Sequence, residues 1–318
     1  MPPFPKPAFA YDYELNAQRE ALRAYRDTKE GRAIPGRADD RLLIATWNIA
    51  NLGVQERREK DYALIAEILS WFELIAIQES NDNLVGIHGI REQLPDYFRL
   101  LLSDAAGNNE RMTFLYDSRK VRQLEEVGEL AIPPSELAYI RLPDSEQGFE
   151  GFDRNPYLGL FQAGAFTVQL ANVHLYFGSA SAVSVSRRKL ETLAVAEWAE
   201  RRRKSPYASS PNILPLGDFN LPKAEPGDPI YDELTSRGLH VPDHATQIGS
   251  SIADEGMHYD QIAFFPGETQ SHFETAGVFD YDGAVFRTLY AERGRDDFLA
   301  YCRYYISDHR PLWAAFAT

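Results

Sequence analysis

Acidic, amide and imidazole side chains stand at the ends of short apolar runs along this chain of 318 residues. Near its end, Asp308 and His309 precede an apolar run, and Asp218 and Asn220 follow another that begins at Ile213. A strand carries the residues at its end to the rim of a sheet, so these runs predict a shared site. The positions concerned are Asn48, Glu79, His174, Asp218, Asn220, Asp260, Asp308 and His309. Together they indicate an acidic, imidazole-containing pocket, which suits a hard divalent cation and a phosphate ester.

In their order along the chain, these residues resemble the endonuclease/exonuclease/phosphatase superfamily, which includes DNase I, the exonuclease III-type repair nucleases, sphingomyelinases and inositol-polyphosphate phosphatases. The resemblance extends from about Arg41 to Phe316, almost the whole chain. It implies a DNase I-like fold, which is a four-layer α/β sandwich with two packed mixed β-sheets between outer helices.

Three of these residues are predicted to hold a metal ion. The carboxylate of Glu79 follows a mostly apolar run, so on leaving a buried strand it must meet a cation or water. The resemblance implies that Asn48 acts at the water shell of the metal or at the phosphate, and that Asp308 could serve a metal. An oxygen-rich set without a zinc-type Cys-His cluster favours Mg²⁺, for which Mn²⁺ could substitute. Part of the family has a further polar group where this chain has Ile49 and Ala50, so the number of metal ions at the site, one or two, stays open.

Asp218 and Asn220 are predicted to act on the phosphate. They flank Phe219, so in an extended strand both side chains would point the same way. The resemblance implies that Asp218 positions or deprotonates the attacking water and that Asn220 holds a nonbridging phosphate oxygen.

Two histidines are predicted to supply protons. The resemblance implies that His309 binds and protonates the phosphate in the transition state, while Asp260 orients its imidazole. His174 is expected to donate to the phosphate or to protonate the leaving oxygen.

Two arginines are predicted to bind phosphates of the substrate. Arg154, two residues before Pro156, matches an Arg-x-Pro segment with which DNase I-like members grip a phosphate, and a planar guanidinium suits bidentate contact. Arg111 is expected to contact the DNA backbone. Many nucleases of the family place a tyrosine near this point, where this chain has Met112, and that departure weighs against the DNA contact.

Two further patterns have both a structural and a functional interpretation. Basic clusters at 187–189 and 201–204 flank one predicted helix, and the second lies where the helix dipole favours cations. A solvated helix end is therefore favoured over a nucleic-acid track. The segment 273–305 is rich in aromatic residues, most of which are predicted to lie in the core, while some could form a wall on which a base stacks.

These side chains need a scaffold of strands and helices, and the hydrophobic periodicity predicts one. Residues from Arg111 to Tyr116, the turn 117–120 and a strand from Val121 are interpreted as a hairpin. The predicted strands are 41–48, 74–79, 111–116, 165–175, 213–216, 261–265 and 312–316, and the predicted helices are 13–28, 57–71 and 186–203.

Residues 1–40 are predicted to be an N-terminal helical extension, and residues 41–318 the endonuclease/exonuclease/phosphatase domain. Leu15, Leu22 and Tyr25 form an apolar face in the extension. The favoured interpretation is a helix packed on the outside of the domain. The alternative is an arm that docks a protein partner.

The composition limits the functional classes. A formal net charge of −14 argues against a protein that coats nucleic acid nonspecifically, since Lys and Arg supply such affinity, but it leaves room for a nuclease that uses a metal and a few arginines. The single cysteine, Cys302, excludes an internal disulfide framework. No stretch approaches the ~20 apolar residues of a membrane span, and the start lacks the apolar core of a secretory signal, so a soluble cytoplasmic protein is expected.

The leading hypothesis is a Mg²⁺-dependent phosphodiesterase that hydrolyses DNA as an endonuclease, with metal-activated water as the nucleophile. The first alternative is a phosphatase or phosphodiesterase of a small or lipid phosphate ester, which the net charge and Met112 favour. The second is a catalytically inactive binding module, against which the complete set of chemical residues weighs.

Overall fold

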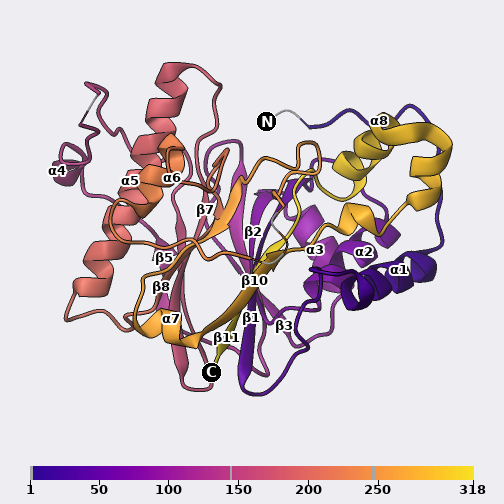
Figure 1. The fold of residues 1–318 in the computed structure, drawn as a ribbon, viewed down its shortest axis with the longest axis horizontal. Coiled ribbons are helices and arrows are strands. Elements are labelled where there is room, and N and C mark those ends of the chain that lie inside the picture. The colour runs from indigo at the N-terminus through magenta and orange to yellow at the C-terminus, as the bar shows by residue number, and fades with distance from the viewer. Residues whose placement is uncertain (1–2, 144, 245, 247) are drawn as a thin grey trace.

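The computed structural model describes residues 3–143, 145–244, 246 and 248–318. Its centre is a pair of mixed β-sheets that pack face to face (Figure 1). The six-stranded sheet has the order β10-β11-β1-β2-β4-β3 and comprises β1 (Arg41–Leu52), β2 (Leu74–Asn81), β3 (Phe98–Leu102), β4 (Glu110–Asp117), β10 (Phe273–Val278) and β11 (Leu312–Ala317). The five-stranded sheet has the order β5-β6-β7-β8-β9 and comprises β5 (Arg122–Glu129), β6 (Tyr157–Ala163), β7 (Phe166–His174), β8 (Ile213–Asp218) and β9 (Asp260–Ile262).

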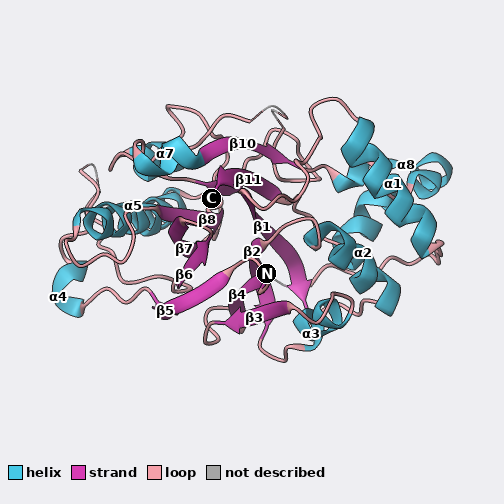
Figure 2. Cartoon of the chain, turned by 90° about the horizontal axis from the view of Figure 1, so that it is seen from below, coloured by secondary structure: helices cyan, strands magenta, loops and turns pink. Residues whose placement is uncertain are grey.

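Helices cover the outer face of each sheet, and this confirms the predicted four-layer α/β sandwich. Against the six-stranded sheet lie α1 (Leu15–Thr28), α2 (Glu59–Leu69), α3 (Val85–Glu92) and α8 (Arg287–Tyr305). Against the five-stranded sheet lie α5 (Ala182–Lys204) and α6 (Pro229–Thr235). The short helices α4 (Pro134–Leu137) and α7 (Glu268–His272) and the 3₁₀ turn η1 (Tyr281–Gly283) belong to connections. Figure 2 shows the same layers from below.

The central strand β1 is apolar on both faces because it is buried on both. Leu42 and Ile44 point into the core between the two sheets. Leu43, Ala45 and Trp47 alternate with them and point into the second core, between the six-stranded sheet and its helices. This period of two along a nearly continuous apolar run is typical of a strand covered on both sides.

Strand direction brings the ends that carry polar residues to one edge of the sandwich. The pairs β1–β2 and β7–β8 are parallel, so their carboxyl ends lie at the same edge of each sheet. Strands β11 and β9 run antiparallel to β1 and β8, so their amino ends lie at that edge as well. In the second case the register places Asp260 directly opposite Asp218.

The predicted hairpin after β4 is wrong. Strand β4 already has neighbours on both sides, because it pairs with β2 and with β3. The turn that begins at Asp117 instead carries the chain to the other sheet, where β5 pairs with β6. Strand β5 has a polar sequence without a buried residue, as suits the edge of a sheet, and its strand neighbour is β6.

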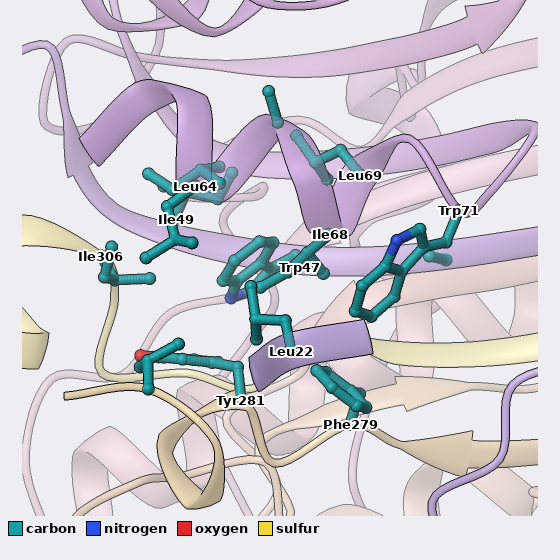
Figure 3. Packing of buried hydrophobic residues seen from close by; sticks show 14 of the residues in the cluster. Leu22, Trp47, Ile49, Leu64, Ile68, Leu69, Trp71, Phe279, Tyr281 and Ile306 are labelled. Carbon is teal, nitrogen blue, oxygen red and sulfur yellow. The ribbon is translucent and has the colours of Figure 1, made fainter. Parts of the chain in front are cut away.

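The N-terminal segment packs on the outside of the six-stranded sheet. Leu22 of α1 is fully buried, and Figure 3 shows it among Trp47, Trp71 and Phe279. The hydroxyl of Tyr13 donates to Asp61 Oδ1 of α2 at 2.8 Å, and Arg23 forms two hydrogen bonds of 2.7 Å with Glu67. The contacts match the favoured interpretation of this segment, and its role in docking a partner stays a prediction.

Most rings of the aromatic segment 273–305 lie in the core, as predicted. Phe279, Tyr281, Phe286 and Tyr301 belong to the core cluster that includes α8, a helix that the sequence analysis did not predict. These rings therefore do not form a wall at the surface. Among the helices of the described residues, none combines the length and the apolar composition that a membrane span requires.

Candidate active site

The side chain of Asn48 joins the ends of three strands. Its amide nitrogen Nδ2 donates to Glu79 Oε1 and to Asp218 Oδ2, at 3.0 Å in each case. Asn48 and Glu79 come from neighbouring strands of the six-stranded sheet, whereas Asp218 ends β8 in the other sheet. The amide oxygen Oδ1 is buried and has no hydrogen-bond partner among the described residues. An orphaned buried oxygen costs free energy unless a ligand meets it.

A break in the ladder between β2 and β4 lies at Glu79. The register of β2 shifts between Ile77 and Ser80, and Glu79 itself has a φ of 62°, in the left-handed region. Its second oxygen, Oε2, accepts a hydrogen bond of 2.7 Å from the backbone N–H of Asn51. A local distortion of this kind is costly for a residue other than glycine and is typical of functional sites.

The oxygen atoms of Asn48, Glu79 and Asp308 fit a hard divalent cation. Neither Glu79 nor Asp308 forms an ion pair with a lysine or arginine of the described residues, and Asp308 Oδ1 lies 4.0 Å from His309 Nε2. Burial and the negative charge of Glu79 raise the pKa of Asp308. Mutually repelling carboxylates beside an orphaned amide oxygen are chemically suited to Mg²⁺. The assignment of these three ligands stays a prediction.

His309 and Asp260 form a hydrogen-bonded pair that joins the two sheets. His309 Nδ1 lies 2.7 Å from Asp260 Oδ2, and both residues are buried. Burial alone would lower the pKa of His309, but the attraction of Asp260, Asp308 and Asp218 outweighs it and holds that pKa well above its ordinary value. The pair is the geometry predicted for a charged imidazole oriented by an acid.

A hydroxyl group to which the sequence analysis gave no role fixes the position of His309. Ser307 Oγ donates to the carbonyl oxygen of Asn48 at 2.6 Å and accepts from the backbone N–H of His309 at 3.0 Å. The indole N–H of Trp47 donates to the carbonyl oxygen of His309 at 2.8 Å. The segment before β11 is therefore tied to the end of β1. The sequence feature that could have indicated this role is a serine two residues before the predicted catalytic histidine.

A second acid–imidazole pair, which the sequence analysis missed, lies on the other side of Asp218. His174 Nδ1 is 3.0 Å from Glu110 Oε2, and His174 Nε2 is 3.7 Å from Asp218 Oδ2. The spacing of Nδ1 and Oε2 is that of a close ion-pair contact, and neither atom has a hydrogen-bond partner among the described residues. Burial would raise the pKa of Glu110, but His174 and Arg154 outweigh it and lower that pKa to about 2. The sequence feature that could have indicated this pair is the acid Glu110 at the start of β4, an antiparallel neighbour of the strand that carries Glu79.

The two pairs converge on one carboxylate. Asp218 Oδ2 lies 3.8 Å from His309 Nε2 as well as 3.7 Å from His174 Nε2. Burial would raise the pKa of Asp218, and the attraction of both imidazoles outweighs it and lowers that pKa. One ligand-type atom from each of Asp218, Asp260 and His309 lies within 4.8 Å of the others. The predicted catalytic residues thus come together in space.

Asn220 reaches the site by a route that differs from the prediction. Strand β8 ends at Asp218, and Asn220 has a φ of 52°, so the segment is not extended. Asp218 Oδ1 accepts a hydrogen bond of 2.8 Å from the backbone N–H of Asn220. The side-chain nitrogen Nδ2 of Asn220 donates to the carbonyl oxygen of Leu175 at 2.7 Å. Phe219 packs into the core below. The role of Asn220 at the phosphate stays a prediction.

Arg154 is buried beside the second acid–imidazole pair. Its Nε donates to the carbonyl oxygen of His174 at 2.9 Å and an Nη to that of Leu175 at 3.2 Å. The other Nη lies 3.5 Å from Glu110 Oε2 and 3.3 Å from Asp153 Oδ2. The guanidinium therefore holds the end of β7 in place, and its contact with a phosphate stays a prediction.

Arg111 lies at the start of β4 and is partly exposed. Its Nε lies 2.8 Å from Asp82 Oδ1, and an Nη donates to the carbonyl oxygen of Ser103 at 2.5 Å. The neighbouring Met112 is buried between the sheets. Met112 therefore offers no contact to a substrate, and the predicted phosphate contact of Arg111 would require it to leave Asp82.

Comparison with known proteins identifies relatives of this arrangement. No protein-family model matches the chain. A protein named deoxyribonuclease from Thioalkalivibrio sp. (strain K90mix) is 32% identical over 299 residues, which cover 89% of this chain and 73% of that protein.

Solved structures share the fold at low sequence identity. An endonuclease/exonuclease/phosphatase family protein from Bacteroides thetaiotaomicron superposes with a TM-score of 0.56 at 18% identity, covering 87% of this chain and 94% of that one. TDP2 of D. rerio, complexed with a single-strand DNA product, superposes with a TM-score of 0.54 at 14% identity, covering 88% of this chain and 100% of that one. From the relative and the shared fold, the chain belongs to the endonuclease/exonuclease/phosphatase superfamily and is a phosphate-ester hydrolase.

Proposed function

We propose that this protein is a Mg²⁺-dependent phosphodiesterase that cleaves DNA. The observation that carries the proposal is the pair of acid–imidazole contacts that meet at Asp218 Oδ2, 3.7 Å from His174 and 3.8 Å from His309. Two imidazoles around one ionised carboxylate can handle both the attacking and the leaving oxygen of a phosphodiester. The relative named deoxyribonuclease, which covers most of the chain, favours DNA as the ester.

Asn48, Glu79 and Asp308 would hold the ion. When bound, Mg²⁺ supplies positive charge to the phosphate oxygens and lowers the pKa of a coordinated water. The residues of this chain have to bring the phosphate to the ion and manage two protons.

His309 is proposed to bind a nonbridging oxygen of the phosphate through Nε2. Its raised pKa keeps the imidazole charged at neutral pH, and Asp260 fixes the ring by holding Nδ1. A charge that is already in place stabilises the negative charge that grows on the phosphate in the transition state.

Asp218 and His174 are proposed to serve the two ends of the reaction. The ionised Asp218 orients the attacking water and takes its proton as the new oxygen–phosphorus bond forms. His174 Nε2 gives a proton to the leaving oxygen as the old bond breaks, and Glu110 at Nδ1 stabilises the charged imidazole. Asn220 is proposed to hold a second phosphate oxygen.

Hydrolysis of a small or lipid phosphate ester is the alternative. The net charge of −14 and the buried Met112 favour it, since both leave few cationic or polar contacts for a long DNA strand. The two functions differ in substrate and share the same residues at the phosphate.

A substrate panel tests the proposal. The purified protein is incubated with supercoiled plasmid, linear duplex, single-stranded DNA, RNA and small phosphate mono- and diesters, each with Mg²⁺, Mn²⁺ or excess EDTA. We expect cleavage of DNA with either ion and none with EDTA, because the ligand set is all oxygen. Glu79→Gln should weaken the binding of Mg²⁺, so that raising the Mg²⁺ concentration recovers part of the rate.

Each outcome of the panel has a defined meaning. Full turnover in excess EDTA would rule out the metal-dependent mechanism. Hydrolysis of a small ester with every nucleic acid left intact would replace the nuclease by the small-ester hydrolase. The matched background is a His309→Ala preparation, which exposes any contaminating nuclease.

A further inference from the structure

We infer that Phe177 forms a stacking site for an unpaired nucleobase next to the scissile phosphodiester. This inference rests on the proposed function and names the form of DNA that the site accepts. Phe177 follows His174 by three residues, in the connection between β7 and α5. Its ring is 39% exposed, although most large apolar side chains of the chain are buried.

The backbone holds Phe177 near the site residues. Three residues span at most ~10 Å, so Phe177 is held within about that distance of His174. Because β7 and β8 are parallel and α5 joins them, α5 begins at the edge of the sandwich where the site residues meet (Figure 1). The exposed side chain of Phe177 is therefore carried by the connection that leaves this edge.

A buried cation covers one face of the ring. The guanidinium of Arg188 lies 5.2 Å from the ring centroid of Phe177. Its Nη atoms donate to the carbonyl oxygen of Asn220 at 3.0 Å and to that of Ser179 at 3.3 Å. The cation therefore links the ring to the segment after β8 that carries Asn220, and the inference assigns the base to the opposite face of the ring.

The guanidinium of Arg188 is not paired with a carboxylate of the described residues. It is 4% exposed, forms no ion pair within 4.0 Å in the part of the chain that is described, and its Nε has no hydrogen-bond partner there. The first turn of α5 also has no acidic residue. A buried positive charge and a helix N-terminus together favour the approach of a polyanion, even to a chain with a net charge of −14.

Ring stacking selects for unpaired bases. Every nucleobase has an aromatic face, so an exposed ring accepts bases without regard to sequence. Within a duplex, each base already stacks on its neighbours, and its face is closed to a protein ring. The structure thus points to single-stranded DNA, or duplex ends and gaps with unpaired bases, as the preferred substrate.

The test compares Phe177→Ala with Phe177→Trp, and uses Tyr207→Ala as the matched control. Tyr207 is an exposed aromatic residue (88%) beyond the other end of α5. On a single-stranded oligonucleotide, Phe177→Ala should lower kcat/KM about 5- to 150-fold, the fold-change that corresponds to the loss of one base stack. Phe177→Trp should retain the wild-type rate within a few-fold. The ratio of rates on single-stranded DNA and on methyl p-nitrophenyl phosphate should fall in Phe177→Ala alone.

An abasic substrate makes the test specific. One oligonucleotide series carries an abasic nucleotide at each position near the mapped cleavage site. At one position the abasic substrate should slow the wild-type enzyme as much as Phe177→Ala does, and the two changes combined should cost no more than either alone. Additive losses at every position, or equal rates for Phe177→Ala and Tyr207→Ala, would overturn the stacking site while DNA cleavage itself stands. A wild-type protein that cuts no DNA would overturn the proposed function and the stacking site together.

Discussion

At the scale of single residues, the site is organised around the carboxylate of Asp218. Its Oδ2 atom accepts from Asn48 Nδ2 and lies between the Nε2 atoms of His174 and His309. Each imidazole has an acid at its other nitrogen, Glu110 in one case and Asp260 in the other. This arrangement, in which each ring has its own acid and both rings face one central anion, is what supports the proposed division of proton transfer between the two imidazoles.

Replacing His309 by alanine should abolish most of the turnover. The change removes the charged group proposed at the phosphate, and a positioned acid–base group contributes on the order of 10²–10⁴-fold. Steady-state kinetics at saturating Mg²⁺ measures kcat, with the exposed His88 on α3 as the control substitution. Near-wild-type turnover of His309→Ala would remove the Asp260–His309 pair from the mechanism.

Replacing Glu110 by glutamine should slow the reaction at every pH tested. The pKa of about 2 means that Glu110 is ionised throughout an ordinary assay, so the variant loses a charge that high pH cannot restore. We expect a fall in kcat of about 10- to 100-fold, less than for loss of a whole acid–base group, with KM for the substrate nearly unchanged. A full pH–rate profile identical to that of the wild type would contradict the role given to this acid.

The residue types at the site and the Asp260–His309 pair could be predicted from the sequence and the family resemblance, whereas the partner of His174 could not. Asp260 and His309 stand at the ends of apolar runs, and such ends are visible in one dimension. The contact of Glu110 with His174 depends on how two sheets pack, which no local pattern records. The same holds for Arg154, whose hydrogen bonds to the carbonyl oxygens at the end of β7 have no signal in the sequence, while its contact with a phosphate stays a prediction.

At the scale of elements, the apolar periodicity predicted the strands but did not determine which strands pair with one another. The segments that became β4 and β5 were found, yet their close spacing suggested a hairpin. The decisive fact is that β2 and β3 occupy both sides of β4, and this is a property of the assembled sheet. Helix α8 was missed because its aromatic residues serve as core and its polar ones are scattered, with Gly294 interrupting the helix.

Replacing Leu22 of α1 by alanine should destabilise the whole domain. Leu22 is fully buried in the core that contains Trp47, so the loss should be about 2–5 kcal/mol in the free energy of unfolding. Urea unfolding measures this value, with the exposed Glu20→Ala on the same helix as the control. A change below about 0.5 kcal/mol would mean that α1 is a detachable arm, as the partner-docking interpretation requires.

At the scale of the whole molecule, the negative charge sets how DNA can be bound. The net charge is −14, and the two arginines predicted to meet phosphates, Arg111 and Arg154, are already in contact with carboxylates. Affinity should therefore come from the metal site and from local contacts, and depend weakly on salt.

The salt dependence of binding measures this directly. Each phosphate contact contributes about −0.7 for single strands to −0.9 for duplexes to the slope of log K against log salt concentration. We expect a slope no steeper than about −3, measured by fluorescence anisotropy with the inactive His309→Ala variant. If Arg111 leaves Asp82 for the DNA strand, Arg111→Ala should make this slope shallower by the contribution of about one phosphate contact. A slope of about −6 or steeper would mean an extended basic track, contrary to this expectation.

The division of each acid–imidazole pair between the two sheets also bears on how the chain is made. Strands β5 to β9 form one continuous stretch, 122–262, between the earlier and later strands of the six-stranded sheet. Asp308 and His309 follow all other residues of the site in chain order. On a ribosome they emerge after every partner they contact, so a nascent or truncated chain has no complete His309 pair. The proposed role of His309 therefore predicts that activity appears only after Asp308 and His309 have been added to the chain, and that its recovery on refolding reports the docking of the two sheets.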